Sequence, residues 1–118
     1  MKNFKDMIIW NQGIELAVSA YELTRQLPKE EIYGLSSQIK RAAVSIPANI
    51  AEGCSRETDK DFKKFLKTSL GSAFELETHL IIAERVKLIK SVHVNNFFLA
   101  LHTEQKQINT LISRLKER

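Results

Sequence analysis

The chain has 118 residues, which is one domain by size and too short for two. It contains 4 glycines and 2 prolines, too few for the many tight turns of an all-β fold. The formal net charge of +4 permits an acidic partner such as nucleic acid without requiring one, and the single cysteine, Cys54, excludes an internal disulfide.

The N-terminal stretch has an apolar patch but no long hydrophobic region followed by a small-residue cleavage site. The sequence also has no run of about 18 apolar residues that could span a membrane. One unpaired cysteine suits a reducing compartment. We therefore expect a cytoplasmic protein without a membrane partner.

The first predicted helix covers about residues 5–26. Leu27 and Pro28 end it, because a residue that precedes proline is pushed out of the α region. Further apolar residues widen its apolar face, so we expect burial on more than one side. Steps of three and four residues separate Met7, Trp10, Ile14, Ala17, Tyr21 and Thr24.

The second predicted helix, about residues 36–54, contains the stretch RAAVSIPANIAEG. On a helical wheel its polar residues form one stripe, whereas a strand would mix them with apolar neighbours. Pro47 is expected to kink this helix at a cost of about 3 kcal/mol, with the Ser45 hydroxyl near a freed carbonyl and Gly53 at the helix end. The stripe consists of Gln38, Arg41, Ser45, Asn49, Glu52 and Arg56.

Two long amphipathic helices are predicted at about residues 59–86 and 92–117. Thr58 can cap the first of them, with Asp61 three residues on. Gly71 lies in its middle, and with Ser72 and Ala73 it is expected to allow a close helix crossing against the alanines of the second helix. The apolar face of the last helix includes Val94, Phe98, Leu101, Ile108, Ile112 and Leu115.

The predicted fold is all-α, an antiparallel up-down four-helix bundle in a single domain, residues 1–118. The first two helices are apolar over more of their circumference than one neighbour can cover. This surplus indicates an oligomer, and the alternative is a monomer with a larger core.

A family resemblance rests mainly on the block QIKRAAVSIPANIAEGCSR, residues 38–56. It resembles the signature of the "four helix bundle protein" family, known from open reading frames in intervening sequences of bacterial 23S rRNA genes. The accessory protein of diversity-generating retroelements is a relative. The resemblance extends to the region of Trp10, to LPKEEIYGL (27–35), to GSAFEL (71–76) and to the last helix. One departure is Lys87, where the family often has a glycine at a helix end.

This resemblance implies a four-helix protomer that assembles as a ring-shaped homopentamer. It implies no reaction, and the retroelement relative is thought to bind nucleic acid. The family signature covers Arg41, Asn49, Glu52 and Arg56 of the polar stripe.

The polar stripe of the second helix has several interpretations. It can form a buried hydrogen-bonded network, line the interior of an oligomer, face a ligand, or be a solvated face. We favour the network, because serine and asparagine are poor helix formers and buried charges are normally paired. Glu75 on the third helix is the expected partner for Arg41 or Arg56.

A basic stripe on the third helix is the candidate nucleic-acid interface, since lysines at helical spacing offer point charges to phosphates. The alternative is a solubilising face, and nearby acidic residues partly neutralise it. The stripe is Lys60, Lys63, Lys64 and Lys67, and a second basic end comprises Lys106, Arg114, Lys116 and Arg118.

Enzymatic chemistry has little support in the sequence. Glu75 and His79 share a helix face but lack the further carboxylates of a di-iron bundle, so we expect no metal or other cofactor. Cys54 has no evident histidine partner, and no phosphate-binding glycine loop is present. We predict a non-enzymatic oligomeric scaffold that binds RNA or DNA through phosphates; the alternatives are a protein-interaction scaffold without nucleic-acid affinity, and a hydrolase or metal protein.

Overall fold

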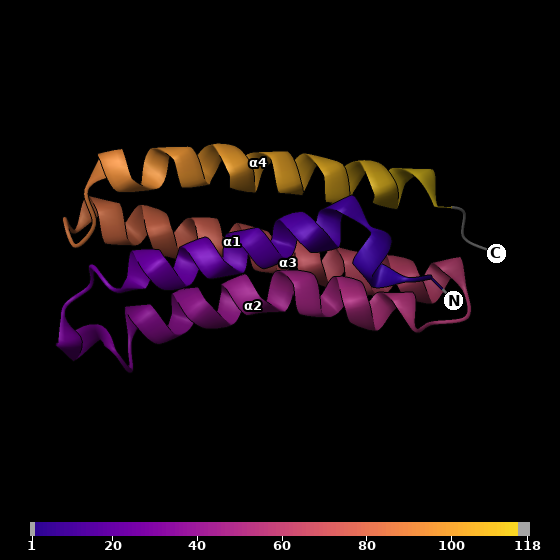
Figure 1. Cartoon of the computed structure of the whole chain (residues 1–118), viewed down its shortest axis with the longest axis horizontal. Coiled ribbons are helices and arrows are strands. Elements are labelled where there is room, and N and C mark those ends of the chain that lie inside the picture. The colour runs from indigo at the N-terminus through magenta and orange to yellow at the C-terminus, as the bar shows by residue number, and fades with distance from the viewer. Residues whose placement is uncertain (1, 116–118) are drawn as a thin grey trace.

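The computed structural model describes residues 2–115 and contains four α-helices in that range (Figure 1). They are α1 (Ile8–Thr24), α2 (Leu35–Cys54), α3 (Asp59–Arg85) and α4 (Ser91–Arg114). Two short 3-10 turns, Phe4–Asp6 and Lys29–Glu31, precede α1 and α2. No strand occurs in this part of the chain, so the prediction of an all-α, four-helix fold is confirmed.

The helices lie along one long axis, and each runs opposite to the helix before it (Figure 1). α1 packs against α2 and α4, and α3 packs against the same two helices. Together they cover an elongated core of buried aliphatic residues with Phe62 and Phe97, and the overall extents are 47 × 24 × 21 Å. None of the helices within residues 2–115 is long and apolar enough to cross a membrane.

The helix boundaries follow local backbone chemistry. α1 begins at Ile8 rather than near residue 5, because the extended backbone of Met7 separates it from the 3-10 turn. α2 is continuous across Pro47, which is buried, so the predicted kink stays a prediction. Thr58 caps α3 as expected: its Oγ1 accepts a hydrogen bond from the Asp61 amide at 3.1 Å. The predicted last residues of the fourth helix, 116–117, lie outside the described range.

Lys87 ends the turn that follows α3 with a positive φ of 66°. The Leu88 amide donates to the carbonyl of Ala83 at 2.9 Å, and the Lys87 amide donates to Glu84 at 3.0 Å. These bonds satisfy carbonyl groups that the end of a helix leaves free. The left-handed conformation costs a residue with a Cβ about 1 kcal/mol more than glycine. Lys87 adopts this conformation at the position where the resembling family often has a glycine, so the substitution has a cost in stability.

The predicted role of Gly71 in a close helix crossing is wrong. A Cβ added there would meet no atom within 4 Å, because Gly71 lies on the exposed side of α3. The close crossing is instead at Gly53, where a Cβ would lie 2.9 Å from both Phe62 and Phe65 of α3. Gly53 is also not a left-handed helix end, since it lies within α2 and no described glycine has a positive φ.

Candidate functional site

Two residues of the polar stripe, Ser45 and Asn49, are half-buried and belong to a hydrogen-bonded seam between α2 and α3. Ser45 Oγ lies 2.7 Å from Ser72 Oγ, and Asn49 Nδ2 donates to the carbonyl and hydroxyl oxygens of Ser45, both at 2.8 Å. Ser69 Oγ, fully buried, donates to the Ile46 carbonyl at 2.8 Å. Ser45 therefore bonds to α3 and to Asn49 in this seam, rather than to a carbonyl freed by Pro47.

The other stripe residues are exposed, and their ion pairs differ from the predicted ones. These residues are Gln38, Arg41, Glu52 and Arg56. Arg56 Nη2 lies 2.8 Å from Glu52 Oε1 and its guanidinium lies over the Phe65 ring, so its partner is Glu52 and not Glu75. Glu75 lies 3.8 Å from His79 Nε2 on its own helix. Arg41 and Glu75 line one small hollow between α2 and α3, without an ion pair between them in the described structure. A network exists, but the charged residues of the stripe lie outside it.

The two basic segments lie at the same end of the bundle. α3 starts where α4 ends, and the two helices pack against each other (Figure 1). Lys60 and Lys67 are exposed and form no ion pair within residues 2–115, whereas Lys64 lies 3.8 Å from Asp61. Lys63 is half-buried and has a partner. Lys106 and Arg114 of α4 are exposed, and the candidates Lys116 and Arg118 lie outside the described residues.

Glu104 is a buried acid that sequence reasoning missed. It is 0% exposed, and neither carboxylate oxygen has a hydrogen-bond partner in the described chain. Its Oε2 lies against α1, 3.1 Å from where a Cβ on Gly13 would be. Burial raises the pKa of Glu104 to about 8, so the group is largely neutral at pH 7. Its spacing gave a usable signal, since Glu104 is three residues after Leu101 and four before Ile108, on the apolar face.

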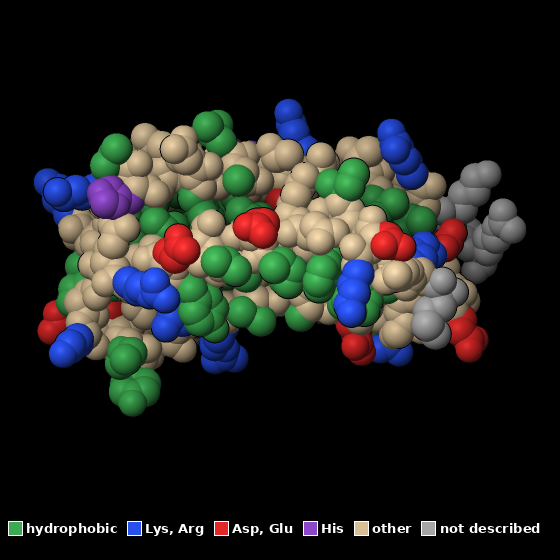
Figure 2. Space-filling view, in the orientation of Figure 1, with side chains coloured by type: hydrophobic (Ala, Val, Ile, Leu, Met, Phe, Trp, Pro, Cys, Tyr) green, Lys and Arg blue, Asp and Glu red, His purple; other side chains and the backbone are tan. Residues whose placement is uncertain are grey.

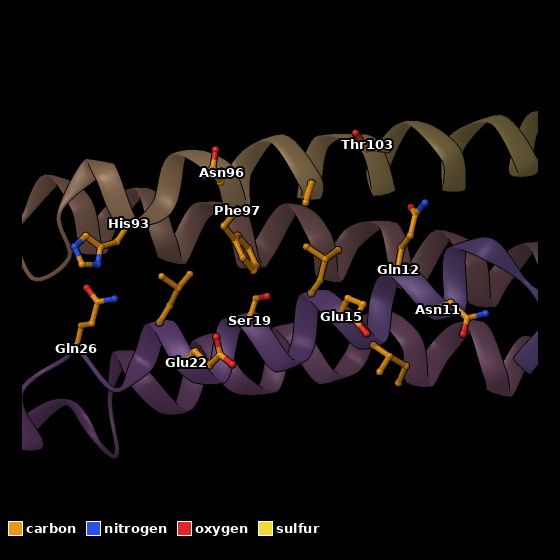
Figure 3. A pocket seen from close by; sticks show the side chains of 14 residues that line it. Asn11, Gln12, Glu15, Ser19, Glu22, Gln26, His93, Asn96, Phe97 and Thr103 are labelled. Carbon is orange, nitrogen blue, oxygen red and sulfur yellow. The ribbon is translucent and has the colours of Figure 1, made fainter.

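A groove of about 800 Å³ runs between α1 and α4 (Figure 3). Phe97 points from α4 towards α1, Gln12 reaches from α1 towards α4, and His93 faces Gln26 at one end. The Oε1 atom of Gln12 is buried and has no hydrogen-bond partner among the described residues. No sequence pattern predicted this groove.

A polar contact also joins α3 to α4. Gln105 Nε2 donates to Glu77 Oε1 at 2.8 Å, and His102 Nε2 lies 3.0 Å from Glu77 Oε2. Burial raises the pKa of Glu77. The hydrogen bonds from Gln105 and His102 and the charge of His102 together lower this pKa by more, so the net pKa shift is downward. The carboxylate is therefore an ionised acceptor that holds the two helices in register.

The described residues contain no cluster of side chains suited to bind a metal ion or to activate Cys54 as a nucleophile. No group of three or more His, Cys, Asp or Glu side chains within residues 2–115 could hold a metal ion. Cys54 is buried with its Sγ 3.3 Å from Met7 Sδ, and burial raises the pKa of its thiol although Lys2 lowers it. A raised pKa keeps the thiol protonated and unreactive at neutral pH.

Four packed helices, a serine–asparagine seam and a basic end define a small all-helical bundle protein. The chain belongs to the family of 23S rRNA-intervening sequence proteins, whose family model matches residues 5–110. The predicted family resemblance is thereby confirmed, whereas the relation to the retroelement accessory protein stays a prediction.

Among solved structures, a protein of unknown function from the S23 ribosomal protein family of Bacteroides thetaiotaomicron is similar in fold. The TM-score is 0.80 at 24% identity, and the alignment covers 89% of this chain and 98% of that chain. At this identity the likeness establishes the fold alone. No curated protein matched the chain.

Proposed function

We propose that this protein is a non-enzymatic, self-associating scaffold whose basic end binds RNA or DNA through phosphates. The observation that carries the proposal is the meeting of two basic segments at one end of the bundle (Figure 1). Because α3 and α4 pack with opposite directions, Lys60 and Lys67 lie at the same end as Lys106 and Arg114. Phosphates spaced along a nucleic-acid backbone suit such an array of exposed cations.

Self-association is supported by two apolar patches on different faces. The α1–α2 patch comprises Val18, Tyr21 and Val44, at 52%, 43% and 44% exposure, and Figure 2 shows apolar side chains along this face. The α3 patch comprises Phe74 and Ile82, at 52% and 46% exposure and two turns apart. In Figure 1, α3 lies behind α1 and α2. Two unlike patches fit a head-to-tail contact, which closes into a ring when the rotation permits, such as the homopentamer that the family resemblance implies.

Head-to-tail assembly is testable by light scattering coupled to gel filtration. Val18→Glu and Phe74→Glu each remove one half of the interface, so each variant alone should be a monomer. Mixed in equal amounts they should form a dimer, because each variant keeps the patch that the other lost. The matched control is Leu99→Glu on α4, 67% exposed and outside both patches, which should assemble as the unmodified chain does. Mixed variants that stay monomeric would contradict a head-to-tail contact.

Nucleic-acid binding is testable by fluorescence anisotropy with structured RNA and duplex DNA across a range of salt. If phosphate contacts dominate, log K should fall linearly with log salt. Lys60→Ala with Lys67→Ala should weaken binding of every sequence and reduce the slope by about 2, because two phosphate contacts are lost.

The matched control removes two exposed lysines, Lys29 and Lys90, at the opposite end of the bundle (Figure 1). This pair should leave the slope unchanged. An equal loss in both double variants would indicate diffuse attraction to net charge, and no binding near 50 mM salt would leave the basic end as a solubilising face. The second outcome favours the alternative, a protein-interaction scaffold without nucleic-acid affinity. The ion pair between Lys64 and Asp61 agrees with this alternative, because it neutralises one lysine of the basic stripe.

A further inference from the structure

The groove between α1 and α4 combines an apolar floor with an acidic rim. Leu16, Leu23 and Phe97 are buried at its base. Its carboxylates are Glu15 and Glu22, and no Lys or Arg occurs among the fourteen described side chains that line it (Figure 3). The chain as a whole carries a net charge of +4, so the groove is an acidic exception on a basic protein.

The two rim carboxylates are spaced and free. Glu15 and Glu22 are seven residues apart, which places them on one side of α1 and about 10 Å apart along its axis. Neither forms an ion pair within the described chain, and both are exposed. At this separation they cannot share one small metal ion, whose oxygen ligands lie about 2.0–2.6 Å from it. They can each bind one positive group of an extended ligand.

The end of the groove beyond Glu15 offers one buried acceptor atom without a donor. Gln12 Oε1 is buried there and has no hydrogen-bond partner within residues 2–115, and Gln12 reaches from α1 towards α4 in Figure 3. A buried acceptor without a partner is costly, and an ammonium group, which has three donors and no acceptor, complements it.

We propose that the α1–α4 groove binds a linear aliphatic polyamine of the spermidine class. Its methylene groups lie on Leu16, Leu23 and Phe97, and its ammonium groups pair with Glu15 and Glu22, with the chain directed towards Gln12. Apolar contact along the floor distinguishes this ligand from an inorganic cation, which gains nothing from it. The site lies between helices, where small-molecule pockets of bundles commonly occur. It is independent of the proposed nucleic-acid interface.

The test is isothermal titration calorimetry of spermidine into protein freed of nucleic acid, with amide shifts followed by NMR. Binding should saturate, and shifts should cluster on residues 11–26 and 93–103. Glu15→Gln with Glu22→Gln should weaken binding at least tenfold. Glu30→Gln with Glu57→Gln removes the same charge from exposed positions outside the groove and should change affinity less than twofold.

A second variant separates the groove from charge in general. Ala100→Trp fills the groove without altering charge, and because Ala100 is exposed the fold should tolerate it; spermidine binding should be lost. Retained binding in Ala100→Trp, an equal loss in both glutamate pairs, or displacement by equimolar Mg²⁺ would each overturn the proposal in favour of a diffuse counterion effect. Binding of a lysine-rich helical peptide in the groove, with none of spermidine, would overturn it in favour of a protein-docking surface.

Discussion

Replacement of Glu104 by leucine should stabilise the fold by roughly 3 to 5 kcal/mol at pH 8, the largest effect that we expect from a single substitution. Glu104 is 0% exposed, and its carboxylate oxygens have no hydrogen-bond partner in the described chain. Leucine has a similar volume and no group to desolvate. Urea unfolding followed by circular dichroism, at one fixed protein concentration, measures the difference.

The pH dependence gives the sharper test of the same residue. Burial raises the pKa of Glu104 from 4.5 to about 8, so between these values the folded chain keeps a proton that the unfolded chain releases. The stabilisation that comes from this tighter proton binding is fully present below pH 4.5. It falls by about 1.4 kcal/mol per pH unit above pH 4.5 and is lost as the pH rises through 8.

Glu104→Gln, which cannot ionise, should remove this loss of stability between pH 5 and pH 8. The matched control is Glu57→Gln, at an exposed position, which should leave the pH dependence of unfolding unchanged. Stability curves that run parallel in the unmodified chain and in Glu104→Gln would contradict a carboxyl held neutral by burial.

Gly53→Ala and Gly71→Ala should have opposite effects on stability, although both exchange glycine for alanine inside a long helix. Alanine is the better helix former by about 1 kcal/mol, and this gain should appear in full at Gly71, where the added Cβ meets no atom within 4 Å. At Gly53 the Cβ would lie 2.9 Å from Phe65 Cβ, an atom that cannot swing aside. Overpacking of this kind costs about 1–3 kcal/mol and should outweigh the gain.

The free energies of unfolding of the two variants, measured in parallel by heat and by urea, should therefore differ by the cost of overpacking, about 1–3 kcal/mol. Each variant is the control for the other, because the change in helix propensity is the same. Gly71→Ala also reports on assembly, since Gly71 lies one turn from Phe74 of the α3 patch. Equal stabilisation by both substitutions would mean that α2 and α3 do not approach closely at Gly53.

Much of the fold was accessible from residue spacing. The stripe from Gln38 to Arg56 predicted a helix through Pro47, and α2 is indeed one helix over Leu35–Cys54. The Thr58 hydroxyl predicted the start of α3, because a cap acts within three residues of chain. Errors arose where a prediction needed a neighbour. Gly71 was assigned a close crossing that belongs to Gly53, and Glu75 was expected to pair with Arg41 or Arg56, whereas Arg56 pairs with Glu52.

The sequence by itself determined four amphipathic helices, the polar stripe of α2 and the basic stripe of α3, because helical periodicity decides which side chains share a face. Only the tertiary structure decided that Ser45 bonds to Ser72 of α3 while Arg41 is exposed, that two basic segments meet at one end, and that Glu104 lies beside Gly13 without a hydrogen-bond partner among the described residues. The physical reason is that burial and partners depend on how neighbouring helices approach one another. Periodicity along one helix carries no information on that distance.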